Sequence, residues 1–162
     1  MTTSDYFLAN RREIAAVCRG WAADGDDPSD DATSTVEYGH LPWVDLKPID
    51  VLPLADLASA LSGVETDEDD VVEYLAGPED CEQVVGRLPQ EFVDAMADQA
   101  DDALRALCDR WVARRLADER PGAPATAAKA RAAASLPMLI SLRKLAREAL
   151  DANREMYVLW SP

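Results

Sequence analysis

Apolar residues recur at helical spacing near the start of the chain. The positions i, i+3, i+4 and i+7 of one stretch are occupied by Ile14, Val17, Cys18 and Trp21. Asn10 followed by Glu13 has the spacing of a capping box, in which two side chains cap the first helical turn reciprocally. The pattern predicts a helix over residues 11–23.

The middle of the chain carries two further helical patterns. One helical face holds Leu54, Leu57 and Leu61, which predicts a helix over residues 51–62 that ends at Gly63. Thr66 followed by Asp69 resembles a second N-terminus and predicts a shorter helix through Leu75.

The longest helical patterns lie in the second half. One begins at Pro89 and continues to Leu116, with a break expected near residues 98–102. After a loop at residues 119–124, another pattern starts at Thr126. Pro137 lies within this last pattern and predicts a kink or a restart, because proline lacks the N–H that a helix interior requires.

Short runs rich in β-branched and aromatic residues predict strands near residues 35–38, 43–46 and 156–160, with a brief one at 84–85. The terminal run is apolar at every position, which is typical of a strand buried on both faces. We expect it to pair with the strands at 35–46 in a small sheet.

Length and composition indicate one folded unit. The chain has 162 residues, of which 48% are hydrophobic, and a chain of this size buries about 70% of its unfolded surface. It contains no internal repeat and no linker long enough to separate two domains. We therefore expect a single α+β domain over residues 1–162, with a small sheet packed against several helices.

Charge is distributed unevenly along this domain. The formal net charge is −15, and the first 80 residues carry 19 acidic and 4 basic side chains, whereas the remaining 82 carry 12 of each. Such an acidic chain is repelled by nucleic-acid phosphates and by anionic lipid, so neither is an expected partner. A neutral second half favours a localised acidic face over salt adaptation of the whole surface.

Two acidic runs, at 24–31 and 65–70, contribute most densely to this face. With Trp43 and Tyr74, two aromatic residues of the acidic half, they form the predicted partner-binding set, because an aromatic anchor ringed by carboxylates suits a basic protein partner. The acidic members of the set are Asp24, Asp26, Asp27, Asp30, Asp31, Glu65, Asp67, Glu68, Asp69 and Asp70.

The cysteines and the N-terminus favour a cytoplasmic location. Cys18, Cys81 and Cys108 form no C-x-x-C pair, and an odd count is unlike a secreted disulfide framework. We expect Cys18 and Cys108 to be buried structural thiols. No apolar run is long enough to span a membrane, and the first ten residues lack the features of a signal peptide.

Candidate chemistry is sparse, and we expect no catalytic site, metal or cofactor. His40 is the single histidine, and no nucleophile motif lies near it. One histidine with three scattered cysteines offers no zinc site. An EF-hand loop beginning at Asp24 would need Gly at 29 and Glu at 35, where this chain has Ser29 and Thr35. The glycine-rich phosphate-binding motifs are absent.

Several short motifs occur in an order that resembles YfbM-like bacterial proteins, a family of unknown function. They are Ser4-Asp-Tyr-Phe7, Val44-Asp-Leu-Lys47 before a Leu-rich helix ending at Gly63, Leu88-Pro-Gln-Glu91, and the helix-then-strand ending from Leu142 to Trp160. The resemblance implies a compact α+β fold and no particular activity. The two acidic runs are not part of it.

The sequence favours a non-enzymatic protein whose acidic half binds and masks a basic surface of a protein partner. Such a partner would be a toxin or a nucleic-acid-binding protein, and the mode would be that of an inhibitor or immunity protein. One alternative is a small enzyme or ligand-binding domain with a pocket around His40 and Trp43. Another is a housekeeping protein that is acidic only because its organism is salt-adapted or GC-rich.

Overall fold

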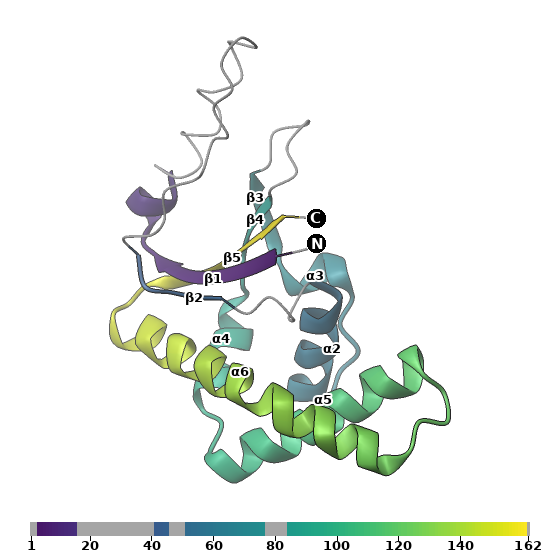
Figure 1. Ribbon diagram of the computed structural model, residues 1–162. Coiled ribbons are helices and arrows are strands. Elements are labelled where there is room, and N and C mark those ends of the chain that lie inside the picture. The colour runs from purple at the N-terminus through teal and green to yellow at the C-terminus, as the bar shows by residue number, and fades with distance from the viewer. Residues whose placement is uncertain (1–2, 16–40, 46–50, 77–83, 162) are drawn as a thin grey trace.

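Five strands form one antiparallel sheet in the computed structural model, which describes residues 3–15, 41–45, 51–76 and 84–161 (Figure 1). The strand order is β2-β1-β5-β4-β3. The strands are β1 Thr3–Ala9, β2 Trp43–Asp45, β3 Glu73–Ala76, β4 Val84–Arg87 and β5 Glu155–Ser161.

The terminal strand β5 occupies the centre of the sheet. It pairs with β1 from Ala9↔Glu155 to Thr3↔Ser161, and on its other side with β4. Alternate side chains of a strand point to opposite faces, and here both faces are covered: Met156 and Val158 join one core, whereas Tyr157 joins the other. Burial on both faces explains why this run is apolar throughout.

Helices cover one face of the sheet and enclose the larger core (Figure 1). The longest, α6, packs against α5, α4 and the strands β1 and β5. The helices are α2 Val51–Ser62, α3 Glu68–Val71, α4 Gln90–Ala97, α5 Asp101–Glu119 and α6 Ala125–Asp151. The α+β class is thus confirmed.

A smaller core lies on the opposite face. Ile14, from a helical turn at residues 11–15, and Leu41 pack there with Phe7 and Tyr157. The rings of Phe7 and Tyr157 stack with centroids 5.6 Å apart. The sheet is therefore buried on both sides where β1 and β5 pair.

Most predicted elements are confirmed where the structure describes them. The helix at 51–62, the break after residue 97 and the strands near 43–46, 84–85 and 156–160 are present. The predicted strand at 35–38 and residues 16–23 of the first helix lie outside the described residues.

Three predictions need correction, and one strand was missed. The helix expected through Leu75 ends at Val71, because Val72 is extended and the next residues pair with β4 as strand β3. The terminal strand β5 was expected to pair with the strands at 35–46. It pairs with β1 and β4 instead, and β1 separates it from β2, the described strand of that region. Strand β1 was not predicted. Helix α6 does not restart at Pro137, because buried Leu139 and Leu142 beyond it continue the same packed face.

Candidate functional site

The structure places the predicted partner-binding residues in different regions. The first acidic run, Asp24 to Asp31, lies outside the described residues. Trp43 belongs to β2 and Tyr74, which is 50% exposed, belongs to β3. These strands are the two edges of the sheet, four strand spacings or about 19 Å apart. The two residues therefore lie on strands at opposite edges of the sheet.

The second acidic run, residues 65–70, leads into the short helix α3 and supplies its first three residues. Glu65 pairs with Arg114 of α5 at 3.2 Å. Asp67 precedes the helix, and its backbone carbonyl accepts hydrogen bonds from the N–H groups of Asp70 and Val71. The side chain of Glu68 lies outside the described part of the chain. Asp69 and Asp70 are exposed.

Asp69 and Asp70 line a cleft of about 500 Å³, which we call the acidic cleft. It lies where α3, β3, β4, β5 and the start of α4 meet. Five carboxylates and one guanidinium line it, from Asp69, Asp70, Glu73, Glu91, Glu155 and Arg87. Sequence reasoning missed Glu73, Glu91 and Glu155, because they are far apart along the chain and only strand pairing and helix packing bring them together.

Arg87 is already held by two of these carboxylates. Its Nη1 donates to Glu155 Oε1 at 2.8 Å, its Nε donates to Glu73 Oε2 at 3.0 Å, and its Nη2 also pairs with Glu73. Tyr157 Oη donates to the other oxygen of Glu155 at 2.6 Å. The hydrogen bond from Tyr157 and that from Arg87 hold the pKa of Glu155 below its ordinary value, and both carboxylates raise the pKa of Arg87.

The remaining carboxylates of the cleft have no such partner. Asp69, Asp70 and Glu91 form no ion pair within the described part of the chain. Glu91 lies in the first turn of α4, where the helix dipole favours a negative charge. The acidic cleft thus carries exposed negative charge that the rest of the described fold does not neutralise.

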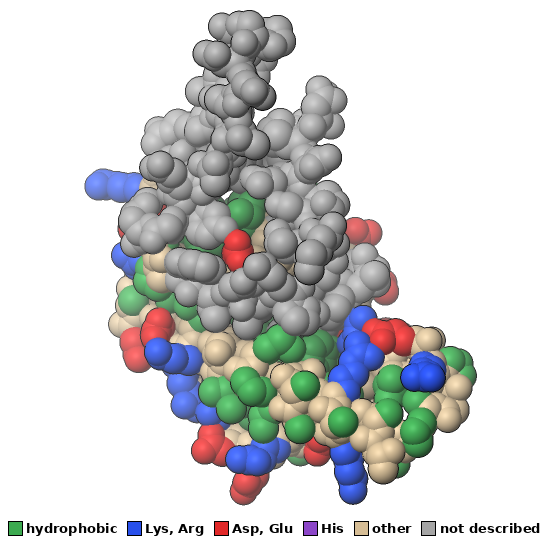
Figure 2. Space-filling model, in the orientation of Figure 1, with side chains coloured by type: hydrophobic (Ala, Val, Ile, Leu, Met, Phe, Trp, Pro, Cys, Tyr) green, Lys and Arg blue, Asp and Glu red, His purple; other side chains and the backbone are tan. Residues whose placement is uncertain are grey.

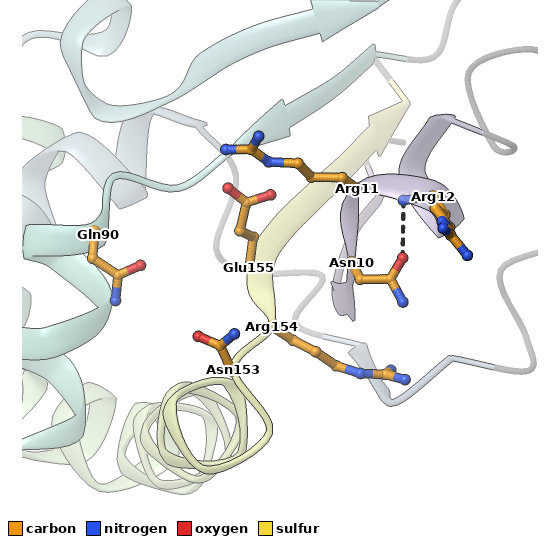
Figure 3. A pocket seen from close by; sticks show the side chains of 7 residues that line it. All are labelled: Asn10, Arg11, Arg12, Gln90, Asn153, Arg154 and Glu155. Atoms are coloured by element: carbon orange, nitrogen blue, oxygen red, sulfur yellow. Dashed lines mark hydrogen bonds between the residues drawn. The ribbon is translucent and has the colours of Figure 1, made fainter.

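A second cleft, of about 620 Å³, adjoins the first and shares Gln90 and Glu155 with it (Figure 3). Its lining includes Arg11, Arg12 and Arg154. In Figure 3 the Arg11 side chain reaches over the carboxylate of Glu155. Glu155 therefore marks the boundary at which the surface changes from acidic to basic.

The helical surface away from these clefts has mixed charge. Figure 2 shows blue and red side chains interspersed over the helical part of the face in view. The helices also carry ion pairs, such as that of Arg115 with Asp56 at 2.9 Å and with Glu119 at 2.7 Å. This mixture agrees with the neutral second half of the sequence.

Metal ligands and nucleophiles are the remaining candidates for chemistry. No group of three or more His, Cys, Asp or Glu side chains among the described residues is placed to hold a metal ion. His40 lies outside the described residues. A cleft of about 650 Å³ beside Leu41 and Pro42 has no Ser, Thr or Cys among its described lining. Cys108 is buried, and burial raises the pKa of its thiol to about 11, so it is no nucleophile in the folded protein.

Comparisons with protein-family models, with curated proteins and with solved structures found no match to this chain. The resemblance to YfbM-like proteins therefore stays a prediction. No helix in the described ranges combines the length and the apolar character that crossing a bilayer requires.

Proposed function

We propose that this protein is a non-enzymatic inhibitor or immunity-type protein, which binds and masks a basic surface of a protein partner in the cytoplasm. The observation that carries the proposal is the acidic cleft, where Asp69, Asp70 and Glu91 are exposed and have no ion pair among the described residues. Carboxylates in this state attract a cationic surface at little cost, because no internal salt bridge must first be broken.

Masking would work by occlusion. The carboxylates would occupy the positions where a toxin, nuclease or other nucleic-acid-binding protein holds phosphate, and the net charge of −15 would steer the encounter. Arg11 and Arg12, which are exposed and line the neighbouring cleft, add positive charge to the surface beyond Glu155. A partner with a basic patch bordered by an acidic one would then bind in a single orientation, because the reverse orientation juxtaposes like charges.

The test begins with affinity capture on the immobilised protein, washed at low and then moderate salt, followed by purification of any stoichiometric basic partner. Association with that partner is then measured for a variant carrying Asp67→Asn, Glu68→Gln, Asp69→Asn and Asp70→Asn. We expect association on the order of tenfold slower at low salt, with the difference lost at high salt and thermal stability unchanged.

A control variant removes the same number of charges elsewhere. Asp98, Asp109, Asp118 and Asp151 are exposed residues of the helical region, and their replacement by Asn should leave association nearly unchanged. Equal slowing by both variants would mean that net charge alone matters. Unchanged kinetics for the first variant, or capture of only a salt-labile mixture of basic proteins, would overturn the proposal.

A further inference from the structure

An apolar pocket of about 190 Å³ opens beside the acidic cleft, between α2, α3 and α4. Val71 and Phe92 in its lining are buried, and Leu61 is partly buried. Asp70 and Glu91, which also line the acidic cleft, are exposed. The pocket therefore has an apolar floor and two carboxylates at its edge, on the side of the acidic cleft.

One wall of the pocket is held in place by hydrogen bonds. The buried Ser59 Oγ donates to the carbonyl of Ala55 at 2.9 Å and accepts from the N–H of Thr66 at 2.9 Å. Gly63, with φ of 75°, turns the chain between the end of α2 and Thr66. The pocket is thus built by the fold, and a ligand group entering it need not order the chain first.

Size and chemistry together restrict what the pocket accepts. Its volume is below the roughly 300–1,000 Å³ of pockets for small molecules and cofactors, so a single side chain is the better match. A purely apolar side chain would cover Asp70 and Glu91 without giving them a partner, which is costly. Arginine and lysine combine an apolar stem with a cationic head, and the planar guanidinium matches carboxylates in a bidentate geometry that ammonium lacks.

We propose that this pocket is the anchor site for one arginine side chain of the basic partner, with the stem over Leu61, Val71 and Phe92 and the guanidinium between Asp70 and Glu91. The inference rests on the proposed masking function and adds a specific contact to it. Buried arginines in pockets are frequent hot spots of protein interfaces, so one partner residue would contribute strongly to affinity.

The test uses n-butylguanidinium chloride as a probe of the side chain, titrated into the isotopically labelled full-length protein at constant ionic strength. Amide shifts of Val71, Phe92 and Ala95 should saturate. Guanidinium chloride, n-butylammonium chloride and 1-butanol serve as comparison probes. We expect n-butylguanidinium to bind about tenfold more tightly than guanidinium, because only it buries a hydrocarbon stem.

Two variants test the pocket itself. Glu91→Gln removes a charge at its edge, and Ala95→Leu fills it from α4; each should weaken n-butylguanidinium binding severalfold. Asp98→Asn, an exposed change at the other end of α4, is the matched control and should have no effect. Glu91→Gln alters an exposed side chain, so the test survives if Ala95→Leu fails to fold.

Equal binding of guanidinium and n-butylguanidinium would overturn the anchor, as would n-butylammonium or 1-butanol binding as tightly as n-butylguanidinium. Shifts spread along the acidic cleft without saturation would also overturn it. If the anchor fails while the variant at residues 67–70 still slows association, the masking function stands without it. If n-butylguanidinium binds as expected, but neither the variant at residues 67–70 nor its charge-matched control changes the association rate, the pocket stands and the masking function fails.

Discussion

Arg154 Nη2 donates a hydrogen bond to Glu13 Oε1 at 3.2 Å and so joins the first helical turn to the residue before the last strand. The other oxygen of Glu13 accepts from the Asn10 N–H at 2.7 Å, while Asn10 Oδ1 accepts from the Glu13 N–H at 3.0 Å. This reciprocal pair is the capping box predicted from sequence. Glu13 therefore both caps a helix and fixes it to the residue that precedes β5.

Loss of this cap should destabilise the protein. Asn10→Ala removes the acceptor for the N–H groups of Arg12 and Glu13, and we expect the free energy of unfolding to fall by about 1 kcal/mol. Urea denaturation measures the change. Asn10→Asp keeps the acceptor and should stay close to wild type; equal losses for the two variants would contradict the capping role.

A second prediction concerns the C-terminal end of α4. Arg147 donates through Nε to the carbonyl of Ala97, the last residue of α4, at 2.8 Å and through Nη2 to that of Gln99, just beyond the helix, at 3.1 Å. The first of these bonds satisfies a carbonyl that the end of the helix leaves unpaired. Arg147→Met should lower the free energy of unfolding by about 1.5 kcal/mol. Lys144→Met, on the same helix but 79% exposed, should change it by less than about 0.5 kcal/mol. If denaturant titrations gave similar losses for Arg147→Met and Lys144→Met, the hydrogen bonds from Arg147 would not be what stabilises this end of α4.

The buried thiol of Cys108 should be chemically silent in the folded protein. Its Sγ lies 3.4 Å from the carbonyl of Ala132, and burial raises its pKa to about 11, so almost no thiolate exists at neutral pH. In a variant with Cys18→Ser and Cys81→Ser, a chromogenic disulfide reagent should label one thiol only after denaturant is added. Rapid labelling of the native protein would contradict this placement.

Acid stability should depend on Glu155. Because the pKa of Glu155 is lowered in the folded protein, its contribution is fully present above the ordinary pKa of 4.5 and is lost as pH falls through the lowered value. Glu155→Gln should therefore reduce stability at neutral pH and flatten its decline on acidification. Glu148→Gln, which removes a carboxylate 3.7 Å from Lys144, is the control and should keep the wild-type slope in denaturation series across pH.

Deletion of residues 156–162 should abolish soluble expression. The deletion removes nearly all of the central strand and leaves β1 and β4 without a shared partner. The larger core loses Val158 and the smaller core loses Tyr157. Fractionation of the expressed protein tests this, with removal of Pro162 alone as the control. Soluble, folded protein from the longer deletion would show that the sheet tolerates loss of its centre.

The sequence predicted those elements that are specified by residues close together in the chain. Three patterns of this kind predicted their elements correctly. They are the capping box at Asn10, the leucine stripe that ends at Gly63 and the continuous apolar run at the C-terminus. Strand β1 was missed because its first residues are polar and its strand structure depends on pairing with β2 and β5, which are distant in the sequence. Residues 73–75 were predicted to continue a helix, but they form part of strand β3, because edge pairing with β4 overrides a helical pattern that ends at Val71.

The sequence alone therefore determined the α+β class, the approximate positions of the long helices and the concentration of negative charge in the first half. Only the tertiary structure decided which charges meet. It paired Arg87 with Glu73 and Glu155, left Asp70 and Glu91 beside an apolar pocket, and separated Trp43 from Tyr74. The physical reason is that periodicity and capping act over a few residues, whereas ion pairs and pockets depend on strand order and helix packing between segments distant in the chain.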